Sequence, residues 1–148
     1  MKNCIVICVL IFSFYSCEKS AGEGGTSIIE GRILKTFTDK SEATGLDTTY
    51  YLVPMVGKDV FIIYSDNENE LYDDKYETDH RGKYRFEYLR KGDYTIYTYA
   101  DSVQTYDNSN PIPVDALLEY EYPIFRNIKI SSNNSTNNVD DFIVEKNP

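Results

Sequence analysis

The sequence predicts an all-β protein, a sandwich of two sheets with about seven strands. Residues 83–88 and 94–99 alternate apolar and polar side chains with a period of two, the pattern of strands that bury one face. Aromatic and β-branched residues, which favour strands, fill these segments. After residue 26, no segment has the apolar spacing of an amphipathic helix.

The expected strands differ in how much of their surface is apolar. The first places Ile29 and Ile33 on its inner face. Residues 60–64 are apolar on both faces, as in a central strand, whereas residues 71–78 are charged, as in an edge strand that resists pairing with other molecules. The expected set, in chain order, is 26–35, 50–53 (an added edge strand that ends at Pro54), 60–64, 71–78, 83–88, 94–99, 117–130 and 139–145.

Two of the connections have more than one interpretation. Residues 89–93 either close a hairpin within one sheet or form an arch from one sheet to the other. The tip of a hairpin is exposed and usually polar, so the apolar Leu89 favours an arch whose inner side is buried. Residues 117–130 are a pair of strands or one bent strand, with Ile128 and Ile130 facing inward. Residues 131–138, SSNNSTNN, have the composition of a turn.

A longer motif joins these segments. From Thr78 to Ile96 the chain follows the pattern T-D-x-x-G-x-Y-x-F-x-x-L-x-x-G-x-Y-x-I, which resembles the core of carboxypeptidase regulatory-like domains, small prealbumin-like sandwiches related to Cna protein B-type repeats. The likeness extends to the segments Ile29–Ile33 and Val56–Val60. The resemblance implies an immunoglobulin-like or prealbumin-like sandwich. It implies no particular activity, because members are accessory or structural modules of many different proteins.

The first residues have the layout of a signal peptide. Lys2 precedes an apolar run from Cys4 to Phe14, which is shorter than the roughly twenty residues that span a bilayer. The ending Phe14–Cys17 resembles a bacterial lipobox, which implies cleavage before Cys17 and attachment of acyl chains such as palmitate to Cys17. The alternative is an ordinary secretory peptide, but a polar segment directly after Cys17 favours the lipoprotein.

The chain divides into three expected parts. Residues 1–16 are the signal peptide, residues 17–26 are the lipidated cysteine with a flexible Gly- and Ser-containing tether, and residues 27–146 are the sandwich. The lipid makes the membrane a partner. Acidic residues soon after Cys17 resemble signals that send some lipoproteins to the outer surface of Gram-negative bacteria. We therefore expect lipid anchorage at the outer membrane of the cell envelope, and both its inner face and its exposed outer face remain as alternatives.

Charge and cysteine content exclude several functions. Cleavage removes Lys2 and no acidic residue, which changes the net charge from −9 to −10 and makes nucleic acid an unfavourable partner. All three cysteines precede residue 18, so the sandwich has no thiol nucleophile, zinc cluster or disulfide. His80 is the only histidine, so a histidine-based catalytic triad has no recognisable member beyond this one imidazole. We therefore expect neither catalysis nor a cofactor.

Two kinds of binding residue remain as candidates. Tyr97 and Tyr99 lie on the face opposite Tyr94 and Ile96, where their rings can stack on sugars; a structural interpretation, in which the outer rings pack under a loop, is favoured. Oxygen-bearing side chains between residues 66 and 74 resemble calcium ligands but lack the spacing of an EF-hand, so no metal is expected there.

These observations leave three functional hypotheses. The first is a non-catalytic envelope lipoprotein whose sandwich binds a protein or a glycan. The second is a structural subunit or spacer that associates with itself through a sheet edge, for which residues 50–53 are the candidate strand. The third is a carbohydrate-active enzyme that uses a pair of carboxylates. Crosslinking separates the first two, because self-association produces homotypic ladders.

Overall fold

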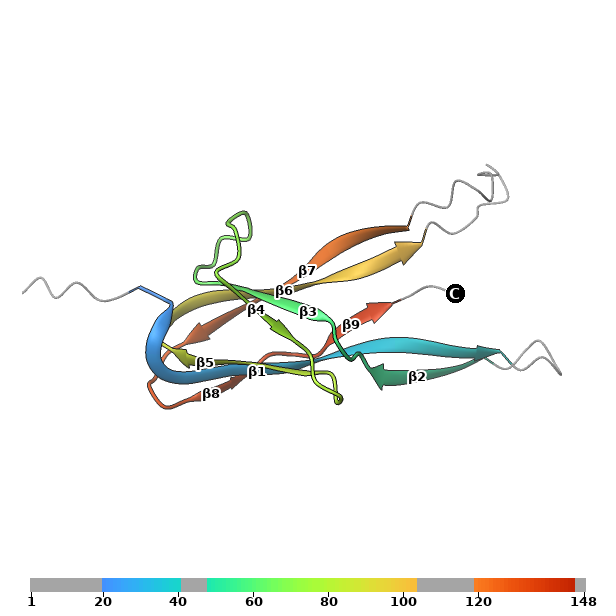
Figure 1. Ribbon diagram of the computed structural model, residues 1–148, viewed down its shortest axis with the longest axis horizontal. Helices are drawn as coiled ribbons and strands as arrows, with labels where there is room; N and C mark the ends of the chain where they lie inside the picture. The colour runs from blue at the N-terminus through green and yellow to red at the C-terminus, as the bar shows by residue number, and fades with distance from the viewer. Residues whose placement is uncertain (1–19, 41–47, 104–118, 146–148) are drawn as a thin grey trace, which may run out of the picture.

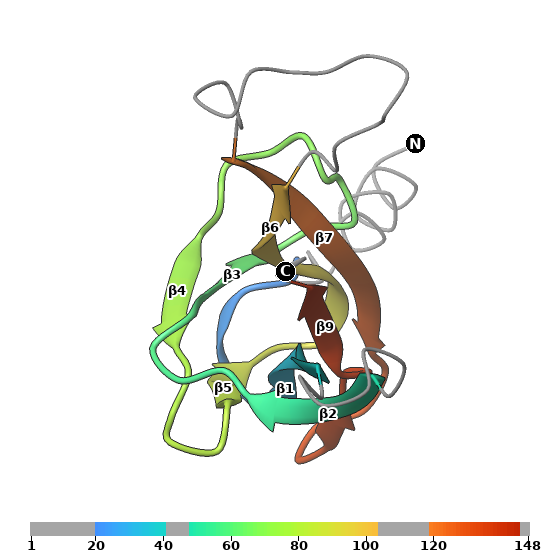
Figure 2. The same cartoon turned by 90° about the vertical axis from the view of Figure 1, so that its right-hand side faces the viewer.

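The computed structural model describes residues 20–40, 48–103 and 119–145. These residues form nine strands in two sheets that face each other as a sandwich (Figures 1 and 2), which confirms the predicted fold class. No helix among them is long and apolar enough to cross a membrane. The strands are β1 (Glu23–Lys40), β2 (Thr48–Pro54), β3 (Asp59–Ile63), β4 (Asp74–Glu77), β5 (Lys83–Leu89), β6 (Gly92–Val103), β7 (Glu119–Ile130), β8 (Thr136–Asn138) and β9 (Phe142–Glu145).

The five-stranded sheet is organised around β1. Strands β5 and β2 pair antiparallel with its first and second halves, while β8 and β9 pair parallel with Ile28–Glu30 and Ile33–Thr36. The other sheet has the order β4-β3-β6-β7, and all its neighbours are antiparallel. The pairs β1–β2 and β6–β7 extend beyond the packed part of the sandwich and diverge at one end of the long axis (Figure 1).

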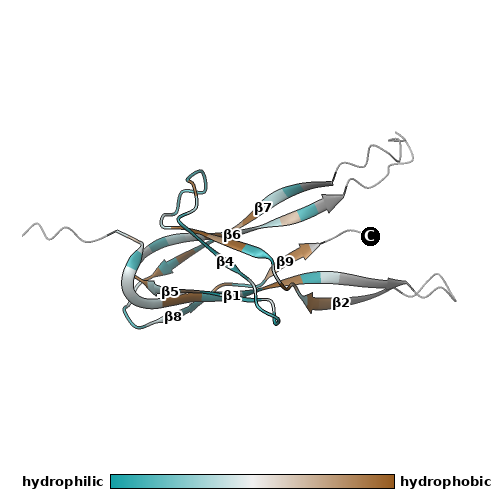
Figure 3. Cartoon of the chain, viewed as in Figure 1, coloured by the Kyte–Doolittle hydropathy of each residue, from teal (hydrophilic) through white to brown (hydrophobic). Residues whose placement is uncertain are grey.

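The core lies between the sheets and follows the two-residue alternation of the strands. Strand β9 contributes Phe142 and is strongly hydrophobic in Figure 3, whereas the loop after β3 is hydrophilic. Each fully buried aliphatic or aromatic side chain stabilises the fold by about 1.5–3 kcal/mol. The side chains that contact one another across the two sheets include Ile29, Ile33, Val60, Ile62, Tyr84, Phe86, Tyr94, Ile96, Ile130 and Phe142.

The connection between β5 and β6 is an arch, as Leu89 indicated. Strand β5 belongs to one sheet and β6 to the other, and Leu89 is only 2% exposed between them. The buried Tyr94, near the start of β6, donates a hydrogen bond from its hydroxyl to the carbonyl of Arg90 at 2.7 Å. This bond holds the corner in place, in the way that a corner tyrosine does in other sandwiches.

The turn before β5 explains the first residues of the motif. The Thr78 hydroxyl donates to the Met55 carbonyl at 2.7 Å, and the Asp79 carboxylate accepts the N–H groups of Arg81 and Lys83. These bonds, the one from Lys83 most of all, hold the pKa of Asp79 below its ordinary value of 3.8. The contribution of Asp79 to stability is therefore complete above that pH, and it is lost as the pH falls through the lowered pKa.

Strand β5 departs from the simple alternation at Tyr88. The sequence placed Tyr88 on the same face as Tyr84 and Phe86, and this was wrong, because Tyr88 is 69% exposed. Its φ is 58°, and the pairing with β1 shifts by one residue at this point. The extra residue is a β-bulge. It turns Tyr88 outward and brings Leu89 into the core.

The Gly-rich segment before residue 27 belongs to the fold. The sequence assigned residues 17–26 to a flexible tether, yet β1 begins at Glu23. A Cβ on Gly25 would clash with the carbonyl of Leu89, and the N–H of Gly22 donates to the Tyr94 hydroxyl at 2.9 Å. Glycine at Gly25 therefore permits a close approach of two backbones rather than flexibility. The tether assignment was wrong from Gly22 onward.

Strand β7 resolves the open question at residues 117–130, of which residues 119–130 are described. It is one strand rather than a pair, with Ile130 buried and Ile128 packed against the core as predicted. The predicted turn at residues 131–138 was wrong at its end, because Thr136–Asn138 forms β8. The Asn137 side-chain amide donates to the Ile28 carbonyl at 3.0 Å, a long-range bond that composition does not reveal.

Candidate functional site

The outer face of the four-stranded sheet carries a group of aromatic rings. Phe61 on β3, Tyr97 and Tyr99 on β6 and Phe125 on β7 share this face, and we call them the aromatic strip. The Phe61 and Tyr97 rings are nearly parallel, with centroids 4.9 Å apart, and the Tyr97 and Phe125 centroids are 5.2 Å apart. Such contacts contribute about 0.5–1.5 kcal/mol per pair beyond the area that they bury.

The two tyrosines that the sequence singled out have different surroundings. Tyr97 is 8% exposed in the middle of the strip, and burial raises its pKa. Tyr72, from the loop before β4, packs its ring 4.9 Å from that of Phe61 and is itself half exposed. Tyr99 meets Phe61 edge to face at 5.9 Å and is partly exposed. Tyr97 thus supports the strip, while Tyr99 is the ring that a ligand can reach.

A hollow of about 540 Å³ lies beside Tyr99. Phe61 and Tyr99 form its apolar part, and charged side chains from β3, β4 and neighbouring segments surround them. Two ion pairs cross it: Lys75 Nζ lies 3.1 Å from Asp59 Oδ2, and Lys58 Nζ lies 3.6 Å from Glu121 Oε1. Apolar rings bordered by charged hydrogen-bonding groups can hold a ligand that has both an apolar face and polar edges.

The acidic loop after β3 uses its polar side chains internally. The Asp73 carboxylate accepts the N–H of Tyr64 at 2.7 Å, and Glu70 accepts bonds from Ser65 and Asn67. In residues 20–40, 48–103 and 119–145, no group of three or more His, Cys, Asp or Glu side chains is arranged to hold a metal ion. The carboxylates of Glu70 and Asp73 are thus engaged with neighbouring residues of the same segment.

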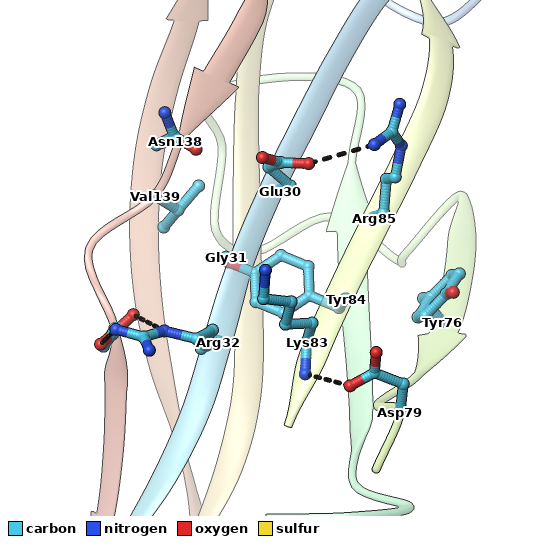
Figure 4. Close-up of a pocket in the computed structure, with 11 residues that line it drawn as sticks. Glu30, Gly31, Arg32, Tyr76, Asp79, Lys83, Tyr84, Arg85, Asn138 and Val139 are labelled. Carbon is cyan, nitrogen blue, oxygen red and sulfur yellow. Dashed lines mark hydrogen bonds and ion pairs between the residues drawn. The ribbon is translucent and has the colours of Figure 1, made fainter. Parts of the chain in front are cut away.

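A second hollow, of about 430 Å³, lies over β1 and β5 on the other sheet (Figure 4). Its surroundings are charged, and the ion pair between Arg85 and Glu30 spans the two strands at 3.3 Å. Sequence reasoning missed this hollow. Its elements are far apart in the chain, and the one local signal is Gly31 in the middle of an otherwise regular strand.

The other residues that the sequence singled out are Cys17, His80 and the acidic side chains. Cys17 lies outside the described residues. His80 is exposed in the turn between β4 and β5, as expected. A glycosidase general acid needs a raised pKa, whereas the pKa of Asp79 is lowered, which makes Asp79 unsuited to that role.

The geometry defines a two-sheet β-sandwich with partly exposed hollows on both sheets, and comparison with known proteins adds little to this. No protein-family model and no curated protein matches the sequence. Among solved structures, the fold is similar to that of a putative carbohydrate binding protein from Pseudomonas aeruginosa, with a TM-score of 0.45 and 12% sequence identity over 85% of this chain and 92% of that one. This degree of likeness carries no argument about function, so the function has to be argued from the chain's own residues.

Proposed function

We propose that this chain is a non-catalytic lipoprotein of the Gram-negative cell envelope, anchored through Cys17, whose sandwich binds a glycan. In this proposal the sandwich is a carboxypeptidase regulatory-like domain that serves as a binding module. The observation that carries the binding role is the hollow beside Tyr99, where aromatic rings meet charged hydrogen-bonding groups. An envelope protein is the other ligand class to be tested at the same surface.

The chemistry of the hollow suits a sugar. The faces of a sugar ring are apolar C–H surfaces that stack on tyrosine or phenylalanine, and its hydroxyls bond to charged side chains at the edge. Phe61 and Tyr99 supply the rings, while Asp59 and Lys75 supply an acceptor and a donor whose positions are held by their mutual ion pair. A volume of about 540 Å³ is in the range of small-molecule sites.

Removal of the exposed ring tests this site. We expect Tyr99→Ala to weaken the binding of glycans at least about tenfold, because stacking and the buried ring area together are worth more than about 1.4 kcal/mol. Binding is measured on a glycan array and then by calorimetry with each glycan that the array identifies. A thermal melt verifies that the variant is folded.

Tyr88→Asn is the matched control. It removes a tyrosine from the other sheet that is more exposed than Tyr99, and asparagine tolerates the positive φ at that position. The control should bind glycans like the unmodified protein. If the intact domain binds no glycan, or if both variants lose binding alike, the glycan proposal fails; capture of an envelope protein that depends on Tyr99 would point to the other ligand class.

The lipid anchor is proposed from the sequence and has its own test. In bacteria that express the full chain, labelled palmitate should enter the protein and should not enter the Cys17→Ser variant, because only the cysteine thiol forms the thioether to the lipid. Gly22 is already bonded to the sandwich, so four residues lie between it and Cys17, and the five steps from Cys17 to Gly22 span at most roughly 18 Å. Equal labelling of both proteins would overturn the anchor at Cys17.

Self-association through β2 is a second candidate function. Its sequence TTYYLVP has no charged residue, in contrast to the edge strands β4 and β7, and Leu52 on it is 55% exposed. If β2 pairs with its copy, crosslinking in cells should give homotypic ladders that Leu52→Lys abolishes and Leu71→Lys, a change in the exposed loop after β3, does not. Crosslinked products that consist of monomer alone would remove this candidate.

A further inference from the structure

Tyr84 is a buried tyrosine whose hydroxyl is unpaired. Its side chain is 1% exposed, and its Oη forms no hydrogen bond with any part of the chain that the structure describes. Burial raises the pKa of Tyr84, so the phenol stays protonated and can both donate and accept. A buried hydroxyl without a partner is destabilising and uncommon in native proteins.

The hydroxyl lies at a point where β1 has no side chain. Gly31 pairs with Tyr84 across β1 and β5, and a Cβ on Gly31 would lie 2.7 Å from Tyr84 Cζ and closer still to Oη. On the other side of Gly31 the neighbouring strand is interrupted, because β8 ends opposite Glu30 and β9 begins opposite Ile33. The ring therefore reaches below the glycine towards a break in the sheet.

The hollow of about 430 Å³ includes this break. Gly31 and Tyr84 line it together with Val139 and Asp141, from the segment between β8 and β9 (Figure 4). Asp141 accepts two bonds from the Arg32 guanidinium, at 2.7 and 3.2 Å. Three acidic and three basic side chains that balance in charge surround the hollow: Glu30, Asp79, Asp141, Arg32, Lys83 and Arg85.

We propose that this hollow is a second binding site, for an uncharged polyhydroxyl ligand of the size of a mono- or disaccharide, one hydroxyl of which pairs with Tyr84 Oη. The volume fits such a ligand. The side chains of Arg32 and Asp141 are 50% and 31% exposed, and an ion pair this exposed is held weakly enough to shift and admit a hydroxyl. The site is separate from the aromatic strip and does not depend on the function proposed for it.

The charges favour a neutral ligand over an anion. The guanidinium of Arg32 is already paired with Asp141, and that of Arg85 contacts both Glu30 and Glu87. An anion at Arg32 or Arg85 would have to displace these carboxylates and would meet their repulsion. A neutral hydroxyl can instead donate to a carboxylate oxygen and accept from Tyr84, and it carries no charge that would compete with the carboxylates for the guanidinium groups.

Titration with sugars tests the site. The folded chain from residue 18 onward is titrated calorimetrically with a panel of neutral mono- and disaccharides (glucose, galactose, mannose, N-acetylglucosamine, maltose, cellobiose and lactose) and, separately, with inorganic phosphate and acetate. We expect saturable binding of at least one sugar and none of the anions. Tyr84→Phe should weaken that binding at least about tenfold, the loss of one buried hydrogen bond, while its melting temperature is unchanged or higher.

The variants separate this site from the aromatic strip. Tyr99→Ala should leave the binding that depends on Tyr84 unchanged. The second site is overturned if no sugar binds, if Tyr84→Phe reduces neither the affinity nor the number of bound sugars, or if phosphate or acetate binds in place of a sugar. Binding that survives Tyr84→Phe and disappears in Tyr99→Ala would support the aromatic strip alone, so the two proposals can fail independently.

Discussion

Replacement of Gly82 by alanine is expected to lower the free energy of unfolding by about 3 kcal/mol. Gly82 has a φ of 69°, where any other residue is strained by about 1–2 kcal/mol. A Cβ there would also lie 2.5 Å from the carbonyl oxygen of Ile33 and 3.1 Å from the nitrogen of Met55, which are backbone atoms that cannot rotate away. The turn has to open, which weakens the bond from the Ile33 N–H to the Gly82 carbonyl.

Gly57→Ala is the matched control for this prediction. Gly57 has a φ of 70°, and the nearest atom to an added Cβ is the flexible Glu77 Oε1 at 3.4 Å. The free energy of unfolding of this variant should fall only by the strain of the positive φ, about 1 kcal/mol. Urea denaturation of the two variants measures the difference. Equal losses would mean that the contact of Gly82 with β1 and the chain after β2 is unimportant.

Tyr94→Phe is expected to lower the free energy of unfolding by about 2 kcal/mol, within the range of about 1–3 kcal/mol for leaving a buried polar group unpaired. Tyr94 is fully buried, and its hydroxyl accepts the N–H of Gly22 at 2.9 Å and donates to the carbonyl of Arg90 at 2.7 Å. Phenylalanine fills the same space but leaves both backbone groups without that partner. The start of β1 and the arch between the sheets should both loosen.

Tyr84→Phe makes the same chemical change at a second buried tyrosine and should have the opposite result. Its hydroxyl has no partner in the described part of the chain, so its removal should be neutral or slightly stabilising. Urea denaturation gives the two free energies, and hydrogen exchange at the Gly22 and Arg90 amides locates the loosening. A loss in Tyr84→Phe as large as that in Tyr94→Phe would show that Tyr84 has a partner in solution.

The parts of the fold that the sequence predicted are those that depend on near neighbours. The alternation around Tyr84 and Phe86 located β5, and the doubly apolar run at Val60–Tyr64 located the central strand β3, because burial of a strand face repeats every two residues. Leu89 indicated an arch because an apolar side chain in a connection has to be covered.

The wrong predictions depend on contacts between distant segments. Alternation cannot foresee the bulge at Tyr88, which forms because β5 carries one residue more than β1 between two pairing points. Composition made Gly22–Thr26 look flexible, whereas Gly25 is required by the approach of Leu89. The parallel strand β8 was missed because its hydrogen-bond partner, β1, lies more than a hundred residues earlier.

For the candidate sites too, the sequence predicted what depends on one strand and missed what depends on contacts between distant segments. Tyr97 and Tyr99 were placed correctly on the outer face of their strand by parity, but their different exposure depends on Tyr72 and on the strands at each side. The hollow over Gly31 was missed completely. It needs Tyr84 from β5 and Asp141 from the end of the chain to meet beside one glycine, and no local pattern contains that information.

The sequence by itself determined that this chain is acidic, that no cysteine follows Cys17 and that the later residues form strands, because composition and a two-residue period are local properties. Only the tertiary structure decided which glycines separate backbones, which tyrosine hydroxyls are paired and where the surface is hollow. Each of these depends on the distance between atoms that the chain brings together from far apart, and hydrogen bonds and steric contacts act only over a few ångströms.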